Sequence, residues 1–111
     1  NSIELVIANN DAMALGAIDA YEKLGVTESN VPAFFGVDGT DDGLEAVQQS
    51  KLAATVYNDK EGQARAMASL AYLAATGGSM KNIKFEDKKY VYLPYEKVTL
   101  DNVNEFVKDE Q

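Results

Sequence analysis

Three short apolar runs, rich in β-branched and aromatic residues, alternate along this chain of 111 residues with stretches whose apolar residues recur every three or four positions. The runs lie at 3–8, 33–37 and 53–57, and the helical stretches are 10–24, one that opens at 41–43, and 59–76. Such runs are typical of strands buried on both faces of a parallel sheet, and the longer period is typical of amphipathic helices. The alternation therefore predicts an α/β fold, an open parallel sheet with flanking helices.

Local signals mark the ends of the predicted helices. Asn10 and Asp11 supply an N-cap and an acidic first turn for the first helix, which Gly25 ends. In the second helix, Asp42 and Glu45 have the spacing of a capping box. These signals support the helix assignments independently of the apolar spacing.

The last part of the chain has a different pattern. Residues 90–93 and 95–99 alternate like strands around Pro94, and residues 100–107 have the apolar spacing of a short helix. The segment 79–89 has the weakest pattern and is predicted to be irregular.

The composition removes several classes of function. The chain has no cysteine and no histidine, which excludes thiol nucleophiles, Cys- or His-dependent triads, and zinc sites built from these ligands. Eighteen acidic residues against ten basic ones give a net charge of -8, which disfavours binding to nucleic acids or anionic membrane surfaces. No run approaches the roughly 20 consecutive apolar residues of a membrane-spanning helix.

Each of the three apolar runs ends on an amide or carboxylate side chain: Asn9-Asn10, Asp38 and Asn58. In open α/β sheets, ligands bind beyond the carboxyl ends of the strands. A carboxylate accepts hydrogen bonds, and a carboxamide both donates and accepts them, so together they match the hydroxyls of a polyol. A phosphate would be repelled by Asp38. The pattern therefore predicts a site for a neutral polyhydroxylated ligand.

Each of these residues also has a purely structural interpretation. Asn10 can be only a helix N-cap, Asp38 can form the turn before Gly39, and Asn58 can begin the following helix. A calcium loop of the EF-hand type at Asp38 is disfavoured, because its twelfth position is Gln49 where a bidentate Glu is needed.

Three motifs of this sequence resemble those of a known protein family. They are Ile7-Ala-Asn-Asn-Asp-Ala-Met-Ala-Leu-Gly16, Phe35-Gly-Val-Asp38 and Thr55-Val-Tyr-Asn-Asp59. With the tail segments 90–98 and 101–106, they resemble the periplasmic galactose/glucose-binding proteins, over nearly the whole chain, as the final third of a longer protein. The first motif is shared more loosely with other sugar-binding proteins and with the effector domains of LacI-type repressors.

The resemblance implies a function outside the cytoplasm. Members of the family are two-lobed, non-enzymatic proteins that close around one hexose and deliver it to an ABC importer in the membrane, and sometimes to a chemoreceptor. By motif, Asn10, Asp38 and Asn58 fall where the family hydrogen-bonds the sugar. Glu4 falls where the family supplies the distal carboxylate of a structural calcium site, although a solvent-facing strand residue is an alternative for Glu4. No other cofactor is implied.

The resemblance also implies a division of the chain. Residues 1–58 and 99–111 would belong to the C-terminal lobe, and residues 59–98 mainly to the N-terminal lobe and the hinge.

The chain starts without Met, almost directly in a strand, and we interpret it as a piece of a longer protein. Because the run 3–8 and the apolar stripe of the helix 59–76 would then lack neighbours, the piece is expected to form homo-oligomers.

Two rival functions stay open at this stage. One is the effector-binding core of a LacI-type transcription regulator, which would need a DNA-binding headpiece upstream. The other is an enzyme of the flavodoxin-like or receiver type with Asp38 as acceptor or base. That enzyme needs a suitably placed lysine, and neither Lys51 nor Lys60 clearly serves.

Overall fold

A computed structural model describes residues 3–26 and 30–107. The chain divides into two compact units, one made of residues 1–58 and 96–111 and the other of residues 59–95. The predicted segment 59–98 differs from the second unit in one respect, because residues 96–98 form a strand of the first unit. The assignment of either unit to a lobe stays a prediction.

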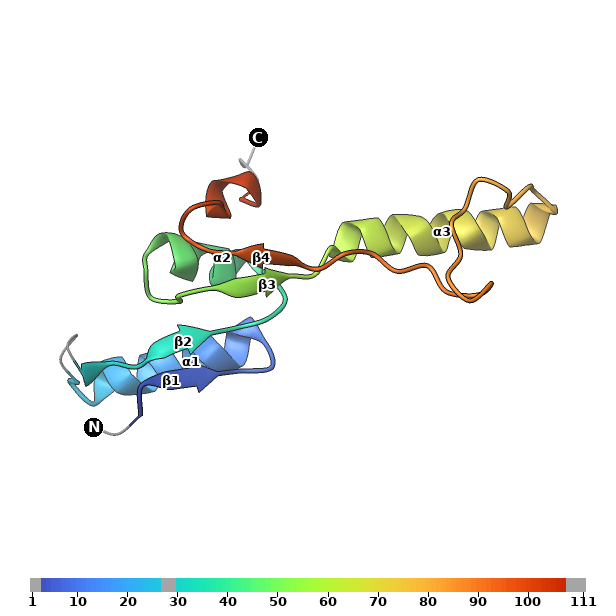
Figure 1. The fold of residues 1–111 in the computed structure, drawn as a ribbon. Coiled ribbons are helices and arrows are strands. Elements are labelled where there is room, and N and C mark those ends of the chain that lie inside the picture. Colours follow the sequence, from blue (N-terminus) through green and yellow to red (C-terminus); the bar gives the residue numbers. More distant parts are fainter. Residues whose placement is uncertain (1–2, 27–29, 108–111) are drawn as a thin grey trace. The chain divides into compact units, whose positions relative to one another are not determined.

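Among the described residues of the first unit, four short strands form two hydrogen-bonded pairs (Figure 1). Strand β1 (Leu5–Ile7) pairs in parallel with β2 (Ala33–Phe35), and β3 (Thr55–Tyr57) pairs antiparallel with β4 (Glu96–Val98). Two parallel bridges, Phe35 with Ala54 and Asp38 with Tyr57, join β2 to β3. The strands therefore lie in sequence order, the first three parallel, and the predicted α/β class is confirmed.

Helix α1 (Asp11–Lys23) begins as predicted, because the Asn10 side chain accepts a hydrogen bond from the Met13 N–H at 2.8 Å. Helix α2 (Asp41–Gln48) begins differently. Its N-cap is Thr40, whose hydroxyl accepts from the Gly43 N–H at 3.1 Å. The predicted capping box of Asp42 and Glu45 is therefore wrong, since the cap lies two residues earlier and Asp42 is already inside the helix.

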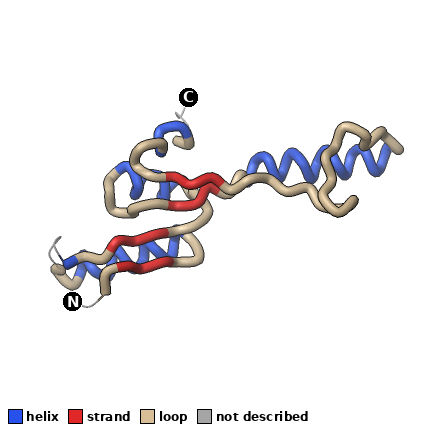
Figure 2. The backbone as a smooth tube through the Cα atoms, viewed as in Figure 1, coloured by secondary structure: helices blue, strands red, loops and turns tan. Residues whose placement is uncertain are grey.

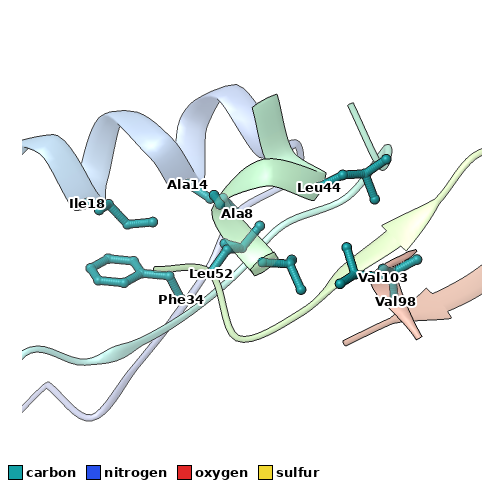
Figure 3. Close-up of a cluster of buried hydrophobic side chains, with 10 residues drawn as sticks. Ala8, Ala14, Ile18, Phe34, Leu44, Leu52, Val98 and Val103 are labelled. Atoms are coloured by element: carbon teal, nitrogen blue, oxygen red, sulfur yellow. The ribbon is translucent and has the colours of Figure 1, made fainter. Parts of the chain in front are cut away.

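The core of the first unit lies between the sheet and these two helices. Phe34 is 1% exposed and meets the Tyr21 ring edge-on at 5.6 Å. Helix α1 contributes Ala14 and Ile18, and further buried side chains come from α2, β4 and η2 (Val103–Glu105): Leu44, Ala46, Val47, Val98 and Val103 (Figure 3). Burial of a Phe or Leu side chain contributes about 2–3 kcal/mol, so this cluster fixes both helices to the sheet.

Strand β1 is covered on one face only, in contrast to the prediction of burial on both faces. Val6 is partly buried beside Phe34, whereas Leu5 and Ile7 are 51% and 73% exposed. Side chains alternate between the two faces of a strand, and α1 packs on the face of Phe34. The opposite face of β1 is therefore open among the described residues.

The second unit consists of α3 (Lys60–Thr76) and an irregular return segment (Figure 2). Asp59 caps the start of α3 by accepting from the Gly62 N–H at 2.9 Å, and Gly77 ends it in the left-handed conformation. The predicted strand at 90–93 is wrong, because only Tyr90 forms a bridge there, with Glu86. Side chains of 91–93 instead line a groove along α3 with Met67 and Leu70.

The last predicted helix is shorter than expected and is the 3-10 helix η2. Within residues 3–26 and 30–107, no helix has the length and apolar character needed to cross a membrane.

Candidate ligand-binding site

The carboxyl ends of the three parallel strands lie side by side. The Asp11 N–H donates to the Val37 carbonyl at 2.8 Å, and the Asp38 N–H donates to the Val56 carbonyl at 2.8 Å. The Asn58 N–H then donates to the Asp38 carbonyl at 3.0 Å. These bonds place the backbones of Asn10, Asp38 and Asn58 at neighbouring positions of one sheet edge, the juxtaposition that the sequence pattern predicts.

Asp38 has a backbone conformation that side-chain-bearing residues rarely adopt. Its φ is 109°, and the following Gly39 has φ of 64°. A Cβ on Gly39 would lie 2.6 Å from the Tyr57 ring, so only glycine fits at that point. Backbone strain of this kind costs on the order of 1–3 kcal/mol and persists where surrounding bonds fix the residue. At Asp38 those bonds run to Val56 and Asn58, on either side of its bridge partner Tyr57.

Asn10 is a helix cap in this structure, as its structural interpretation requires. Its Oδ1 is the atom that accepts from Met13, and the residue is only partly buried. A carboxamide with an engaged oxygen still offers two N–H donors. Capping and ligand binding are therefore compatible, and Asn10 would approach a ligand as a donor.

Asn58 does not cap the helix that follows it. That role belongs to Asp59, whose carboxylate accepts from the Gly62 N–H. Asn58 is partly buried and is fixed through its backbone bond to Asp38. The N-cap of α3 is therefore Asp59 and not Asn58, and the backbone of Asn58 lies at the sheet edge.

Asp11 is a residue that the sequence pattern identified only as a first-turn acid. The structure buries it completely, at 0% exposure. Its Oδ1 accepts from the Thr55 hydroxyl at 2.6 Å, and its Oδ2 accepts from the Thr40 N–H at 2.8 Å and from the Thr40 hydroxyl at 3.2 Å. These partners lie 44 and 29 residues away in the sequence, so no local signal reveals the network.

Glu4 lies at the other end of the sheet. It precedes β1, is exposed, and its carbonyl accepts from the Ala33 N–H at 3.0 Å. Among the described residues, no three or more acidic side chains are grouped in a way that could hold a metal ion. A single carboxylate supplies at most two of the 6–8 oxygens that calcium prefers. The role of Glu4 as a calcium ligand stays a prediction.

One of the two lysines considered for the rival enzyme, Lys51, is remote from the sheet edge. Lys51 lies before the amino end of β3 and forms an ion pair with Glu22 at 2.9 Å. The hydrogen bond and the negative charge of Glu22 raise the pKa of the Lys51 ammonium. Both side chains border a cavity of about 770 Å³ lined by Tyr21 and Phe34, at the amino ends of β2 and β3. This cavity therefore lies at the opposite end of the strands from the Asn and Asp residues.

Comparison with known proteins identifies the class. A family model described as a periplasmic binding protein domain matches residues 1–79. The chain therefore belongs to the periplasmic binding protein family. The family resemblance inferred from the sequence motifs is confirmed, as is the fold class.

Two individual proteins of the family are similar to this chain over nearly its whole length. The D-galactose/methyl-galactoside binding periplasmic protein of Haemophilus influenzae is 39% identical over 110 residues, which cover 97% of this chain and 32% of that protein. A putative rhizopine-binding protein of Rhizobium meliloti is 35% identical over 103 residues, covering 93% of this chain and 31% of that protein. The chain thus spans about a third of the length of these relatives.

A solved structure agrees with both. An ABC transporter solute binding protein from Bacillus halodurans with bound myo-inositol is 40% identical, with a TM-score of 0.79 over 96% of this chain and 33% of that one. The family model and the Haemophilus relative are both described as periplasmic, which confirms the extracytoplasmic location implied by the resemblance.

Proposed function

We propose that the chain forms one wall of the ligand site of a two-lobed receptor that captures a neutral sugar and delivers it to an ABC importer. The observation that carries the proposal is the edge formed by Asn10, Asp38 and Asn58, where backbone bonds hold three polar residues side by side. The proposed ligand is a hexose of the galactose or glucose type. The named ligands of two relatives, D-galactose and myo-inositol, have the same uncharged, hydroxyl-rich chemistry.

Each residue has a separate task in this proposal. The Asp38 carboxylate accepts hydrogen bonds from two vicinal hydroxyls, which are charge-assisted and therefore the strongest in the site. Asn10 donates through its amide N–H groups because its oxygen caps α1. Asn58 donates and accepts. The carboxamides of Asn10 and Asn58 neither give nor take protons near neutral pH, so these two residues serve binding, and we propose no catalytic step.

Glu4 is proposed as one ligand of a calcium site completed by residues outside this chain. It lies at the amino end of β1, away from the sugar-binding edge. The ion would therefore act on the structure of the receptor and not on the sugar. The relatives described above are named as binding proteins, which supports the receptor over a LacI-type effector core.

Calorimetry on the complete receptor tests the proposed function. D-galactose, D-glucose and myo-inositol are titrated, with glucose 6-phosphate as the charged control. At least one neutral ligand should bind with micromolar or better affinity, and the phosphate should bind far more weakly because Asp38 repels it. Failure of every neutral ligand, or a preference for the phosphate, would overturn the proposal.

A further inference from the structure

Asp11 connects all three segments that carry the proposed sugar ligands. It follows Asn10 directly, and its carboxylate binds Thr40, which lies just after Asp38, and Thr55, which lies just before Asn58. We propose that Asp11 is a positioning residue, whose buried carboxylate holds the three strand ends in the geometry that binds the sugar. This inference rests on the proposed function.

The surroundings of Asp11 are shaped for a carboxylate. A Cβ on Gly36 or on Gly43 would overlap the Asp11 carboxylate oxygens, so both glycines leave the space that this side chain fills. The residue also lies in the first turn of α1, where the helix dipole favours a negative charge. Every hydrogen bond given above for the carboxylate is accepted, which suits a group that has acceptors only.

The network acts on the strained turn after Asp38. Thr40 donates its N–H to Asp11 at 2.8 Å, and the Gly39 N–H donates to the Thr55 hydroxyl at 3.3 Å. The two residues that follow Asp38 are therefore fixed by Asp11 directly and through Thr55. Without these bonds, the turn is free to relax from the positive φ of Asp38 and Gly39. The proposed consequence is a displaced Asp38 carboxylate and weaker sugar binding.

Two substitutions of Thr55 separate positioning from packing. Thr55→Val keeps the volume and removes the hydroxyl that donates to Asp11, whereas Thr55→Ser keeps the hydroxyl and removes a buried methyl group. If Thr55 matters only as a core residue, the Ser variant is the more damaging. If it matters through Asp11, the Val variant is.

Asp11→Asn tests the carboxylate itself, with Asp19→Asn as the matched control. The carboxamide introduced by Asp11→Asn must turn its N–H groups toward either Thr40 or Thr55. On the Thr40 side they would face the Thr40 N–H, which is itself a donor. Asp19 lies on the same helix, is exposed and pairs with Lys23 at 2.6 Å, so its substitution makes the same charge change away from the network.

Sugar affinity and dissociation rate are measured on the complete receptor, well below the melting temperature of every variant. Asp11→Asn and Thr55→Val should each weaken affinity about tenfold, the value of one lost charge-assisted hydrogen bond. Thr55→Ser and Asp19→Asn should stay within about twofold of the wild type. Equal losses for Ser and Val, or an Asp11→Asn variant that matches Asp19→Asn, would overturn the inference.

Amide hydrogen exchange without ligand separates this inference from the proposed function. The Gly39, Thr40 and Asn58 amides should exchange faster in Asp11→Asn and Thr55→Val but not in Thr55→Ser, with the Leu70 amide of α3 as internal reference. If the wild type binds no sugar while this exchange pattern is found, the function is wrong and the positioning network stands. Unchanged exchange in Asp11→Asn would refute the network whether or not sugar binds.

Discussion

Asn58 and Asp38 are joined by one backbone hydrogen bond of 3.0 Å, from the Asn58 N–H to the Asp38 carbonyl. The bond continues the parallel pairing of β2 and β3 beyond the strands themselves. It therefore fixes the spacing of two candidate sugar ligands without using either side chain. Substitutions of these side chains should change ligand binding and leave the sheet intact.

Asp38 is predicted to trade stability for binding. Asp38→Gly relieves the positive φ, so its free energy of unfolding should exceed that of Asp38→Ala, which retains the strain, by about 1 kcal/mol. Both variants should lose at least ~2 kcal/mol of sugar affinity because a charge-assisted acceptor is removed. Denaturant unfolding and calorimetry measure the two effects. If Asp38→Gly binds the sugar with wild-type affinity, Asp38 is not a sugar ligand.

Asn10 can be tested with a variant that keeps its cap. Asn10→Asp retains an oxygen that accepts from the Met13 N–H, and Asp caps helices as well as Asn does. Its stability should therefore match the wild type, while sugar affinity falls by about 1–3 kcal/mol because two N–H donors are lost. Asn58→Ala should cost a similar amount of affinity. If Asn10→Asp binds normally, Asn10 is a cap and nothing more.

Two helical glycines should respond to alanine in opposite directions. Gly16 lies inside α1, and apart from its chain neighbours and the backbone of α1 itself no atom lies within 4 Å of the place that an alanine methyl group would take. Gly16→Ala should therefore stabilise the chain by about 0.5–1 kcal/mol. Gly43 lies in α2, where a methyl group would overlap the Asp11 carboxylate, so Gly43→Ala should destabilise it. Thermal unfolding of both variants measures the difference. A stable Gly43→Ala variant would contradict the described packing of Asp11.

Calcium should not bind tightly to these 111 residues alone. Glu4 offers one carboxylate, and the described residues provide no acidic cluster around it. Equilibrium dialysis against calcium should show no stoichiometric micromolar binding, with Glu4→Gln as the control for residual uptake. Tight binding that Glu4→Gln abolishes would mean that this chain holds more of the site than Glu4.

Self-association of the 111-residue chain is expected through the open face of β1. Leu5 and Ile7 are 51% and 73% exposed there, and contiguous apolar surface favours pairing with another copy. Sedimentation at low micromolar concentration should show a dimer or larger species. Ile7→Lys should weaken the association, whereas Met13→Lys, a 58% exposed position on α1, should not. A monomer of 12.0 kDa would contradict the expectation.

The sequence was most informative where local and periodic signals coincide. The limits of α1 follow from the cap at Asn10 and the apolar spacing, and the neighbouring strand ends follow from the βα alternation, because parallel strands end at the same edge. Long-range packing was not accessible in this way. The burial of Asp11 depends on Thr40 and Thr55, which only the folded chain brings near.

Other differences have equally local physical causes. Thr40 caps α2 because its hydroxyl reaches the Gly43 N–H, and the capping-box spacing of Asp42 and Glu45 gives no sign of this bond. Residues 91–93 alternate like a strand but find no partner strand, and their apolar side chains line the groove along α3 instead. Alternation alone therefore identified an apolar face without identifying what it packs against.

Tyr57 pairs with Glu96, so residues 59–95 are inserted in the chain between two strands that lie next to each other in the sheet. The chain leaves the first unit beside the point at which it returns, across one rung of the β3–β4 ladder. The register of β3 with β4 therefore does not depend on the length or the fold of residues 59–95. A tight turn in place of residues 59–95 would convert β3 and β4 into an ordinary hairpin and leave the first unit as a contiguous, transplantable module that keeps Asn10, Asp38 and Asn58.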